Sequence, residues 1–236
     1  MRFLLVLLLP SVAALVLPPY GIGALFPVRG KTLQSTSELD KASRRETLLD
    51  ASDFFVDAFW TGKVGGGSKV LTDAQKQALM QQQVAEFNKR YGGGRRESEL
   101  LVSRNNANEV IACVAVEVDA IREDSMTGPI VDRAPLMSNL AVSRNYRRRG
   151  LAEELVQAVE DLVGEWGYEE CYLYVEQRNQ GAVKLYRKLG YRSVWEDDRA
   201  ETLLPTDNGR LSSSPTVIVC MRKDLGGSFW SRLFQK

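Results

Sequence analysis

The sequence predicts an α/β (α+β) fold in which a mixed central β-sheet is flanked by helices. Residues 100–104 and 110–118 are rich in apolar and β-branched side chains and are joined by Asn105–Asn108, a pattern typical of an antiparallel hairpin. Residues 135–176 then read as strand, amphipathic helix and strand, which forms a parallel crossover when both strands share a sheet. The N-terminal half of the sheet is therefore expected to be antiparallel and the following core parallel.

Two helices are expected before this sheet. Residues 52–60 place phenylalanines close to one helical face behind a Ser-Asp start, and residues 62–68 form a glycine-rich break. Thr72 or Asp73 then opens a second helix that reaches about residue 90 and ends at a run of three glycines.

The later elements follow from periodicity and from turn residues. In order, they are a loop at 122–133, a strand at 135–142, a helix at 151–166, a strand at 170–176, a helix at 180–189, a polar excursion at 196–214 and a last strand at 217–221. Apolar residues recur at helical spacing in 151–166 and at every second position in 170–176. Asn179 and Gly190 are typical caps of the helix between them.

Composition fits one folded domain with appended segments. The 236 residues are 44% hydrophobic and 26% charged, with a formal net charge of +1, so no nucleic-acid partner is expected. The chain has no histidine, and its three cysteines lie in separate apolar runs, so no metal is expected. The domain is expected at 46–225, followed by a tail at 226–236 whose aromatic residues pack back on the domain or contact a membrane or partner.

The first 45 residues resemble targeting sequences. Met1-Arg2 precede the apolar run Phe3–Leu9, as in a signal peptide, and residues 25–45 are rich in basic and hydroxyl side chains, as in a transit peptide. A hydrophobic leader followed by such a segment resembles the bipartite plastid presequences of algae with complex plastids. Plastid localisation is therefore predicted, with secretion and a membrane-tethered protein as alternatives. Membrane contact is expected only through this leader, if it is uncleaved.

One turn of the chain has the features of an anion site. An apolar strand end at Leu140–Val142 is followed by the basic run Arg147–Arg149, by Gly150 and by the start of the 151–166 helix. The first N–H groups of a helix have no intrahelical acceptor and lie at the positive end of its dipole, so they can bind a phosphate. The alternatives for the arginines are a solvated basic turn and a nucleic-acid or nuclear-import patch.

Two motifs carry a family resemblance. Arg147-x-x-Gly150-x-Ala152 resembles the Arg/Gln-x-x-Gly-x-Gly/Ala acetyl-coenzyme A signature of the GNAT superfamily of N-acetyltransferases. Residues 179–191, Asn-Gln-Gly-Ala-Val-Lys-Leu-Tyr-Arg-Lys-Leu-Gly-Tyr, resemble the second signature of that family, one helix and one strand later. The resemblance implies the GNAT fold, acetyl-CoA as cosubstrate, and an acceptor side shaped by the first two helices.

The resemblance also implies roles for individual residues. Backbone groups of Leu140 and Val142 would bind the pantetheine arm and the thioester oxygen, and residues 147–152 would hold the pyrophosphate. The cofactor-binding residues are then Leu140, Ala141, Val142, Arg147, Arg148, Arg149, Gly150, Leu151, Ala152, Asn179 and Tyr186. Asn179 and Tyr186 would be the catalytic residues near the sulfur, with the phenol, of ordinary pKa about 10, as general acid towards the thiolate. The alternative for Tyr186 is an aromatic residue of the core, and the alternative for Asn179 is an ordinary helix N-cap.

The general base is not evident from the sequence. Bacterial ribosomal-protein alanine N-acetyltransferases, which the chain resembles from about Met137 to Met221, have a glutamate where Tyr174 aligns. Glu176, Glu117 and an ordered water remain as candidates. Near pH 7.5 about a third of α-amines of pKa about 7.7 to 8.0 are neutral, against about one in a thousand lysine amines. A site without an obvious base therefore favours N-terminal α-amines.

The sequence thus predicts an acetyl-CoA-dependent protein N-acetyltransferase that acts on N-terminal α-amines and, second, on lysine side chains. Residues 205–210 support this, because a similar Pro-Thr-Asp-Gly-type hairpin precedes the last strand in those N-terminal acetyltransferases. Plastid members of the superfamily combine both activities. The alternatives are a small-molecule amine acetyltransferase and an inert acyl-CoA-binding or assembly protein.

Overall fold

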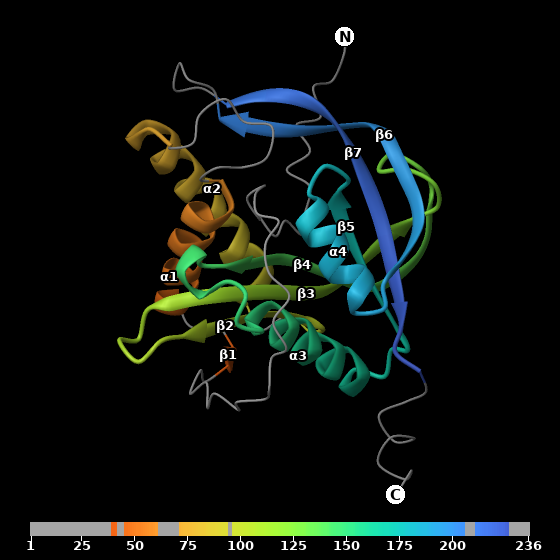
Figure 1. Cartoon of the computed structure of the whole chain (residues 1–236), viewed down its shortest axis with the longest axis horizontal. Coiled ribbons are helices and arrows are strands. Elements are labelled where there is room, and N and C mark those ends of the chain that lie inside the picture. Colours follow the sequence, from red (N-terminus) through yellow and green to blue (C-terminus); the bar gives the residue numbers. More distant parts are fainter. Residues whose placement is uncertain (1–38, 42–44, 61–70, 94–95, 206–210, 227–236) are drawn as a thin grey trace, which may run out of the picture.

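A computed structural model describes residues 39–41, 45–60, 71–93, 96–205 and 211–226 (Figure 1). Most of the predicted leader, the glycine-rich break at 62–68 and the tail from residue 227 lie outside the described residues.

A seven-stranded sheet in the order β1-β2-β3-β4-β5-β7-β6 forms the centre of the protein. The strands are β1 Leu39–Lys41, β2 Ser98–Arg104, β3 Val110–Arg122, β4 Ile130–Val142, β5 Glu170–Glu176, β6 Arg192–Pro205 and β7 Leu211–Asp224. All neighbouring pairs are antiparallel except β4 and β5, which are parallel. The predicted mixed sheet with its parallel crossover is confirmed. The sheet also includes β1, which lies before the expected domain start at residue 46 and pairs with β2.

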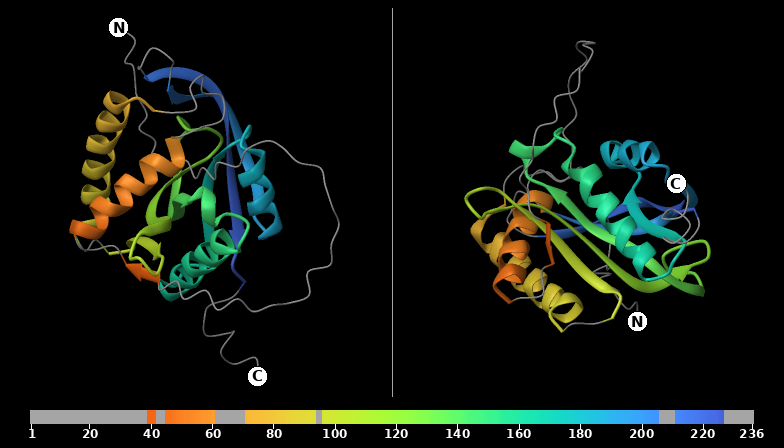
Figure 2. Two further views of the ribbon diagram at one scale, coloured as in Figure 1. Left: turned by 60° about the vertical axis from the view of Figure 1, so that its left-hand side comes forward. Right: turned by 90° about the horizontal axis from the view of Figure 1, so that it is seen from below.

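Two pairs of helices cover the two faces of the sheet (Figure 2). The helices are α1 Arg45–Phe55, continued as the π-helix Val56–Trp60, α2 Asp73–Tyr91, the 3-10 helix Arg144–Tyr146, α3 Leu151–Glu165 and α4 Gln180–Lys188. Aromatic residues of α1 and α2 pack against β2 and β3 in one core. Apolar residues of α3 and α4 pack against β3, β4 and β5 in a second core on the other face.

The prediction of the first helix at 52–60 is wrong at its start. The helix begins at Arg45, because Leu48, Ala51 and Phe55 are buried and share one helical face. Ser52 resembled an N-cap, but its hydroxyl donates to the Leu48 carbonyl one turn earlier, at 2.7 Å. A serine that bonds back in this way lies inside a helix.

Two segments predicted to be irregular contain strand residues. The loop expected at 122–133 is confined to residues 123–129, since Arg122 already pairs with Ile130. The polar excursion expected at 196–214 is a β-hairpin whose ladder extends to the pair Pro205 and Leu211. Side chains in these parts of β4, β6 and β7 are mostly exposed, so the alternation of apolar residues that marks a half-buried strand is absent.

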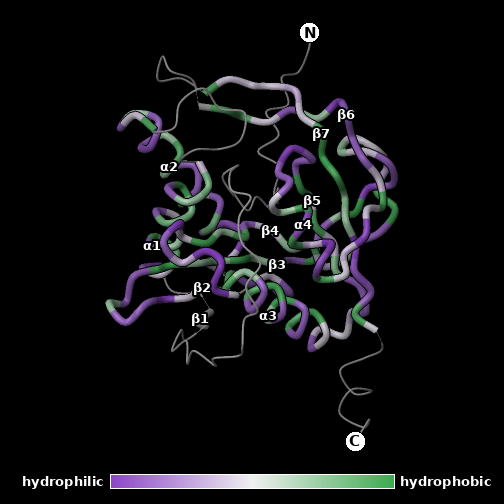
Figure 3. The backbone as a smooth tube through the Cα atoms, viewed as in Figure 1, coloured by the Kyte–Doolittle hydropathy of each residue, from purple (hydrophilic) through white to green (hydrophobic). Residues whose placement is uncertain are grey.

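Hydrophobic residues concentrate in the strands at the centre of the sheet, and the turn between β2 and β3 is hydrophilic (Figure 3). Across the described ranges, no helix is both long and apolar enough to cross a membrane.

Strand β4 has two irregularities that shape the region described below. It pairs with β5 only at Leu136 with Tyr172 and at Met137 with Leu173. Its ladder with β3 contains a bulge, because Ala115 pairs with Ser138 and Cys113 with Ala141, so that two β4 residues lie opposite Val114. The bulge follows directly after the last pair with β5.

Helix α3 is fixed to the sheet by its apolar face, and Leu155 lies near the centre of that contact with 1% of its surface exposed. Leu155→Ala should lower the free energy of unfolding by about 2 to 5 kcal/mol, because it removes transfer free energy and leaves a cavity. Gln157→Ala, on the exposed side of the same helix, is the control and should change it by less than about 0.5 kcal/mol. Denaturant unfolding measures both, and equal losses would contradict this packing of α3.

Candidate active site

A pocket of about 340 Å³ lies where β4 leads into α3, with α4 as its other wall. Its lining residues are Val142, Tyr146, Arg147, Arg148, Gly150, Leu151, Ala152, Glu153, Gly181, Lys184, Leu185 and Lys188. Four of these side chains are cationic and one is acidic. The pocket therefore suits an anionic ligand.

The turn that leads into α3 lines this pocket and contains backbone amides without an acceptor in the described part of the chain. Gly150 is the N-cap of α3 with a φ of 92°, and Arg148 also has a positive φ, 62°. Among the described residues, none of the amides from Arg148 to Ala152 donates a hydrogen bond to another residue, whereas those of Glu153 and Glu154 donate to the Gly150 carbonyl. Consecutive free amides at a helix N-terminus make a concave anion site.

Gly150 is required here for its backbone conformation. A Cβ at this position would meet nothing closer than the Glu154 carboxylate at 3.8 Å, so space does not exclude a side chain. The positive φ does disfavour one, because L-residues rarely adopt it.

The cations of the pocket are held in different ways. The Arg147 Nε donates to the Val142 carbonyl at 2.9 Å, which ties the turn to the end of β4. Burial, with a smaller effect of Arg144, lowers the pKa of Arg147 from its ordinary value. Lys188 on α4 forms an ion pair with Glu153 on α3, with an Nζ to Oε1 distance of 2.6 Å, so this pair links the two walls.

Tyr146 connects the pocket to the β2–β3 turn, which lies beside the end of β4. Its hydroxyl accepts a hydrogen bond from Asn105 in the β2–β3 turn at 3.3 Å. The Arg149 guanidinium lies over its ring, 5.2 Å from the centre, so Arg149 supports the wall without lining the pocket.

The end of β4 presents free amides beside the pocket. The Ser143 amide donates to the Ile111 carbonyl of β3. Because successive N–H groups of a strand point to opposite sides, those of Val142 and Leu140 point away from β3. No residue of β5 pairs with them, since the β4–β5 ladder ends at Met137.

Asn179 and Tyr186 lie on α4 without lining the pocket. Asn179 is the helix N-cap, and its side chain accepts from the Ala182 amide at 3.2 Å. Tyr186 is fully buried, and its hydroxyl has no hydrogen-bond partner in the described part of the chain. Burial, with a smaller effect of Cys171, raises the pKa of Tyr186 far above its ordinary value, so the phenol stays protonated. Its ring packs edge-on against Tyr191, 5.8 Å between centres.

The two carboxylates predicted as base candidates, Glu176 and Glu117, are both engaged in ion pairs. Glu176 is buried and accepts from the Arg178 Nε at 2.6 Å and from the hydroxyls of Thr202 at 3.0 Å and Thr216 at 3.3 Å. Glu117 is buried and paired with Arg90 of α2. Burial raises the pKa of Tyr174, whose ring packs against Trp195, so this phenol is no base at neutral pH.

The structure brings six of the eleven predicted site residues into one pocket. These are Val142, Arg147, Arg148, Gly150, Leu151 and Ala152. The other five, Leu140, Ala141, Arg149, Asn179 and Tyr186, do not line it.

Six lining residues were missing from the predicted set, and four of them are on α4. Gly181, Lys184, Leu185 and Lys188 stand at positions i, i+3, i+4 and i+7, so one face of the predicted helix already carried them. Within the described ranges, no group of three or more acidic, cysteine or histidine side chains could hold a metal ion.

Residues 68–191, more than half of the chain, match the acetyltransferase (GNAT) family. The chain belongs to the GNAT family of acetyltransferases. The members of this family are acyltransferases that use acetyl-CoA, and the match includes all pocket-lining residues and both signature segments.

Curated relatives match shorter stretches. The chloroplastic GCN5-related N-acetyltransferase 4 of Arabidopsis thaliana is 41% identical over 58 residues, which is 25% of this chain and 20% of the relative. An N-alpha-acetyltransferase of Saccharolobus solfataricus is 34% identical over 28% of this chain and 40% of the relative. A ribosomal-protein alanine N-acetyltransferase of Escherichia coli is 31% identical over 36% of this chain and 55% of the relative. The chain thus spans one fifth to just over half of these relatives.

Solved structures share the fold. Naa20 of Chaetomium thermophilum, in complex with a bisubstrate analogue, has a TM-score of 0.55 at 14% identity over 79% of this chain and 86% of its own. The ribosomal-protein alanine N-acetyltransferase of E. coli has a TM-score of 0.51 at 16% identity, over 81% of this chain and 96% of the solved chain. The predicted GNAT fold is confirmed.

The free amides at the start of α3 and the cations of the pocket fit the pyrophosphate of acetyl-CoA, so Gly150→Glu should weaken acetyl-CoA binding more than tenfold. The new carboxylate would lie among the free amides and repel the phosphates. Gly150→Ala is the matched control, since it adds the backbone strain without the charge and should cost about 1 to 2 kcal/mol of stability. Titration calorimetry compares the three proteins. Unchanged affinity in folded Gly150→Glu would place the phosphates elsewhere.

Proposed function

We propose that this protein transfers the acetyl group of acetyl-CoA to N-terminal α-amines of proteins, with lysine side chains as second acceptors. The observation that carries the proposal is the row of free amides at the start of α3, next to the unpaired end of β4. The amides at the start of α3 would suit the pyrophosphate of acetyl-CoA, and the strand amides would suit its pantetheine thioester. Relatives named for N-alpha and ribosomal-protein alanine acetylation support the acceptor class.

The residues of the pocket would hold the cosubstrate. The amides from Arg148 to Ala152 would bind the pyrophosphate, with Arg147, Lys184 and Lys188 supplying positive charge. The Leu140 and Val142 amides would bind the pantetheine arm and the thioester oxygen, where negative charge develops as the amine attacks. Held this way, the acceptor nitrogen would bond to the acetyl carbon and lose a proton to solvent, the carbon–sulfur bond would break, and the thiolate would take up a proton.

Tyr186 is proposed as the donor of that proton. Its hydroxyl has no partner in the described part of the chain, and the raised pKa keeps it protonated at any physiological pH. Asn179 fixes the start of α4 by capping it, and so sets the position of Tyr186 two turns later. The buried phenol without a partner costs stability unless a ligand or water satisfies it, which supports a role beyond packing.

Tyr186→Phe should lower kcat about 10² to 10⁴-fold, as for a lost general acid, while leaving Tm unchanged or higher. The substitution keeps the ring against Tyr191 and removes a hydroxyl that has no partner in the described residues, so nothing in the fold should weaken. Steady-state kinetics and thermal unfolding measure the two effects. Normal kcat would make Tyr186 a core residue, whereas a lower Tm with proportionally lower kcat would indicate damaged packing.

No carboxylate base is proposed, because Glu117 and Glu176 are both ion-paired. The kcat/KM for a peptide with a free N-terminus should therefore rise with pH around the pKa of its own amine, near 8. It should not fall again near pH 10, since burial raises the pKa of Tyr186 and the acid stays protonated above that pH.

The matched peptide for this measurement has a blocked N-terminus and one free lysine. It should be acetylated at least about a hundredfold more slowly near pH 7.5, following its smaller neutral fraction. Mass spectrometry resolves the two products. Equal rates, or a midpoint near pH 6 for both peptides, would require an enzyme base. Acetylation of polyamines or amino acids alone would replace the proposed acceptor with a small amine.

We further propose that residues 1–45 direct the protein to a plastid and that 46–225 form the catalytic domain. The basic, hydroxyl-rich composition of 25–45 supports targeting, as does the match to a chloroplastic relative. Of this segment, the structure describes only β1 and Arg45. The tail at 226–236 is proposed to pack on the domain.

A further inference from the structure

The bulge in β4 inserts one residue into an otherwise regular strand. Met137, Leu140 and Val142 are buried in the core beneath α3, whereas Ala141 packs in the core beneath α1 and α2. In a regular strand successive side chains point to opposite faces of the sheet. The residues of β4 follow this alternation only if Asn139 is left out of the count. Asn139 has a φ of 53°, the left-handed conformation that a bulge of this kind requires at its first residue.

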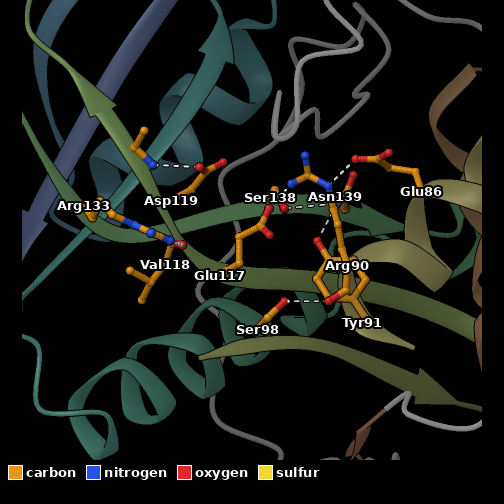
Figure 4. Close-up of polar contacts among 11 residues, drawn as sticks. Glu86, Arg90, Tyr91, Ser98, Glu117, Val118, Asp119, Arg133, Ser138 and Asn139 are labelled. Atoms are coloured by element: carbon orange, nitrogen blue, oxygen red, sulfur yellow. Dashed lines mark hydrogen bonds and ion pairs between the residues drawn. The ribbon is translucent and has the colours of Figure 1, made fainter. Parts of the chain in front are cut away.

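A polar network attaches this bulge to the last residue of α2 (Figure 4). The Asn139 amide group donates to the Ser138 hydroxyl at 3.0 Å and to the Tyr91 hydroxyl at 3.5 Å. The Asn139 carbonyl accepts from the Cys113 thiol at 3.3 Å. Burial raises the pKa of Tyr91, and hydrogen bonds with Ser138 and Asn139 oppose the rise. The side-chain nitrogen and the backbone carbonyl of Asn139 are thereby both engaged.

The end of α2 is itself fixed to the neighbouring strands. Arg90 forms ion pairs with Glu86 on its own helix and with Glu117 on β3. The Ser98 hydroxyl of β2 donates to the Arg90 carbonyl at 3.0 Å. Figure 4 shows Arg90, Tyr91, Glu117 and Asn139 gathered at this junction. Tyr91 is therefore a rigid support for the bulge.

The bulge has a direct effect on the neighbouring strands. A bulged strand bends and its twist increases, which ends pairing with a neighbour. Pairing of β4 with β5 ends at Met137 and Leu173, two residues before Asn139. The Leu140 amide follows the bulge and points into the opening so formed.

We propose that Tyr91, Ser138 and Asn139 are positioning residues, which hold the β4 bulge so that the Leu140 amide faces the acetyl thioester. This inference rests on the proposed function. It adds that the geometry of the thioester site is set from α2, on the face of the sheet opposite α3 and α4.

The test uses full-length protein with ¹⁵N-leucine and reads the Leu140 amide signal by NMR. In the wild type, acetyl-CoA should shift this signal more than CoA does, because only the thioester has the acetyl oxygen. Asn139→Ala, which loses both the side-chain bonds and the left-handed preference, should lose this acetyl-specific shift. Asn139→Gly keeps the backbone conformation and should retain part of it. Tyr91→Phe should weaken it.

Kinetics and affinity separate positioning from stability. For Asn139→Ala, kcat should fall about a hundredfold, while the Kd of CoA, held by the distant amides of α3, should stay within about twofold. Asn108→Ala is the matched control, since Asn108 also has a positive φ, 62°, but lies exposed in the β2–β3 turn. It should lose similar stability and keep the Leu140 shift.

Two results would overturn the inference. One is an acetyl-specific Leu140 shift that survives in folded Asn139→Ala with normal kcat. The other is a wild-type protein that binds acetyl-CoA without any such shift. Absence of acetyl-CoA binding in the wild type is a separate result, which would remove the proposed function and the inference with it.

Discussion

Strands β4 and β5 form two residue pairs, and beyond these pairs they no longer hydrogen-bond to each other. The rest of the site depends on the position at which this pairing ends. A longer ladder would have used the amides of Leu140 and Val142 in the sheet. A shorter one would have left the crossover helix α3 without a fixed relation to α4. The pocket between those helices exists because β3 holds β4 and β7 holds β5 along their lengths, while the C-terminal ends of β4 and β5 do not pair with each other.

The fold was predictable where side chains alternate between two buried environments. Cys171, Leu173 and Val175 lie in the core under α3 and α4, while Tyr172 and Tyr174 pack on the opposite face, so β5 was visible in the sequence. The β6–β7 hairpin was not, because its outer half is solvated and its strands are held by backbone pairing that leaves no hydrophobic pattern. The first turns of α1 were hidden by Ser52, whose type suggests a cap but whose hydroxyl bonds within the helix.

The α3 half of the pocket followed from a short motif, since the arginines and Gly150 are adjacent in the chain. The α4 half depended on knowing that Lys184 and Lys188 face the same space, which requires the packing angle of two helices. The bulge was beyond sequence reasoning for another reason. Its supports, Tyr91, Cys113 and Ser138, come from three elements, and none of them stands out by type or spacing.

The extra residue in β4 has a consequence for how this strand can vary. Without Asn139, Leu140 would stand directly opposite Val114, between the existing pairs of Ser138 with Ala115 and Ala141 with Cys113. The ladder would be uninterrupted and each apolar side chain would keep its present face. A chain shorter by this one residue thus satisfies the hydrophobic cores as well as the present chain does. Burial of the apolar side chains does not require the extra residue in β4. We infer that the extra residue serves the opening between the ends of β4 and β5.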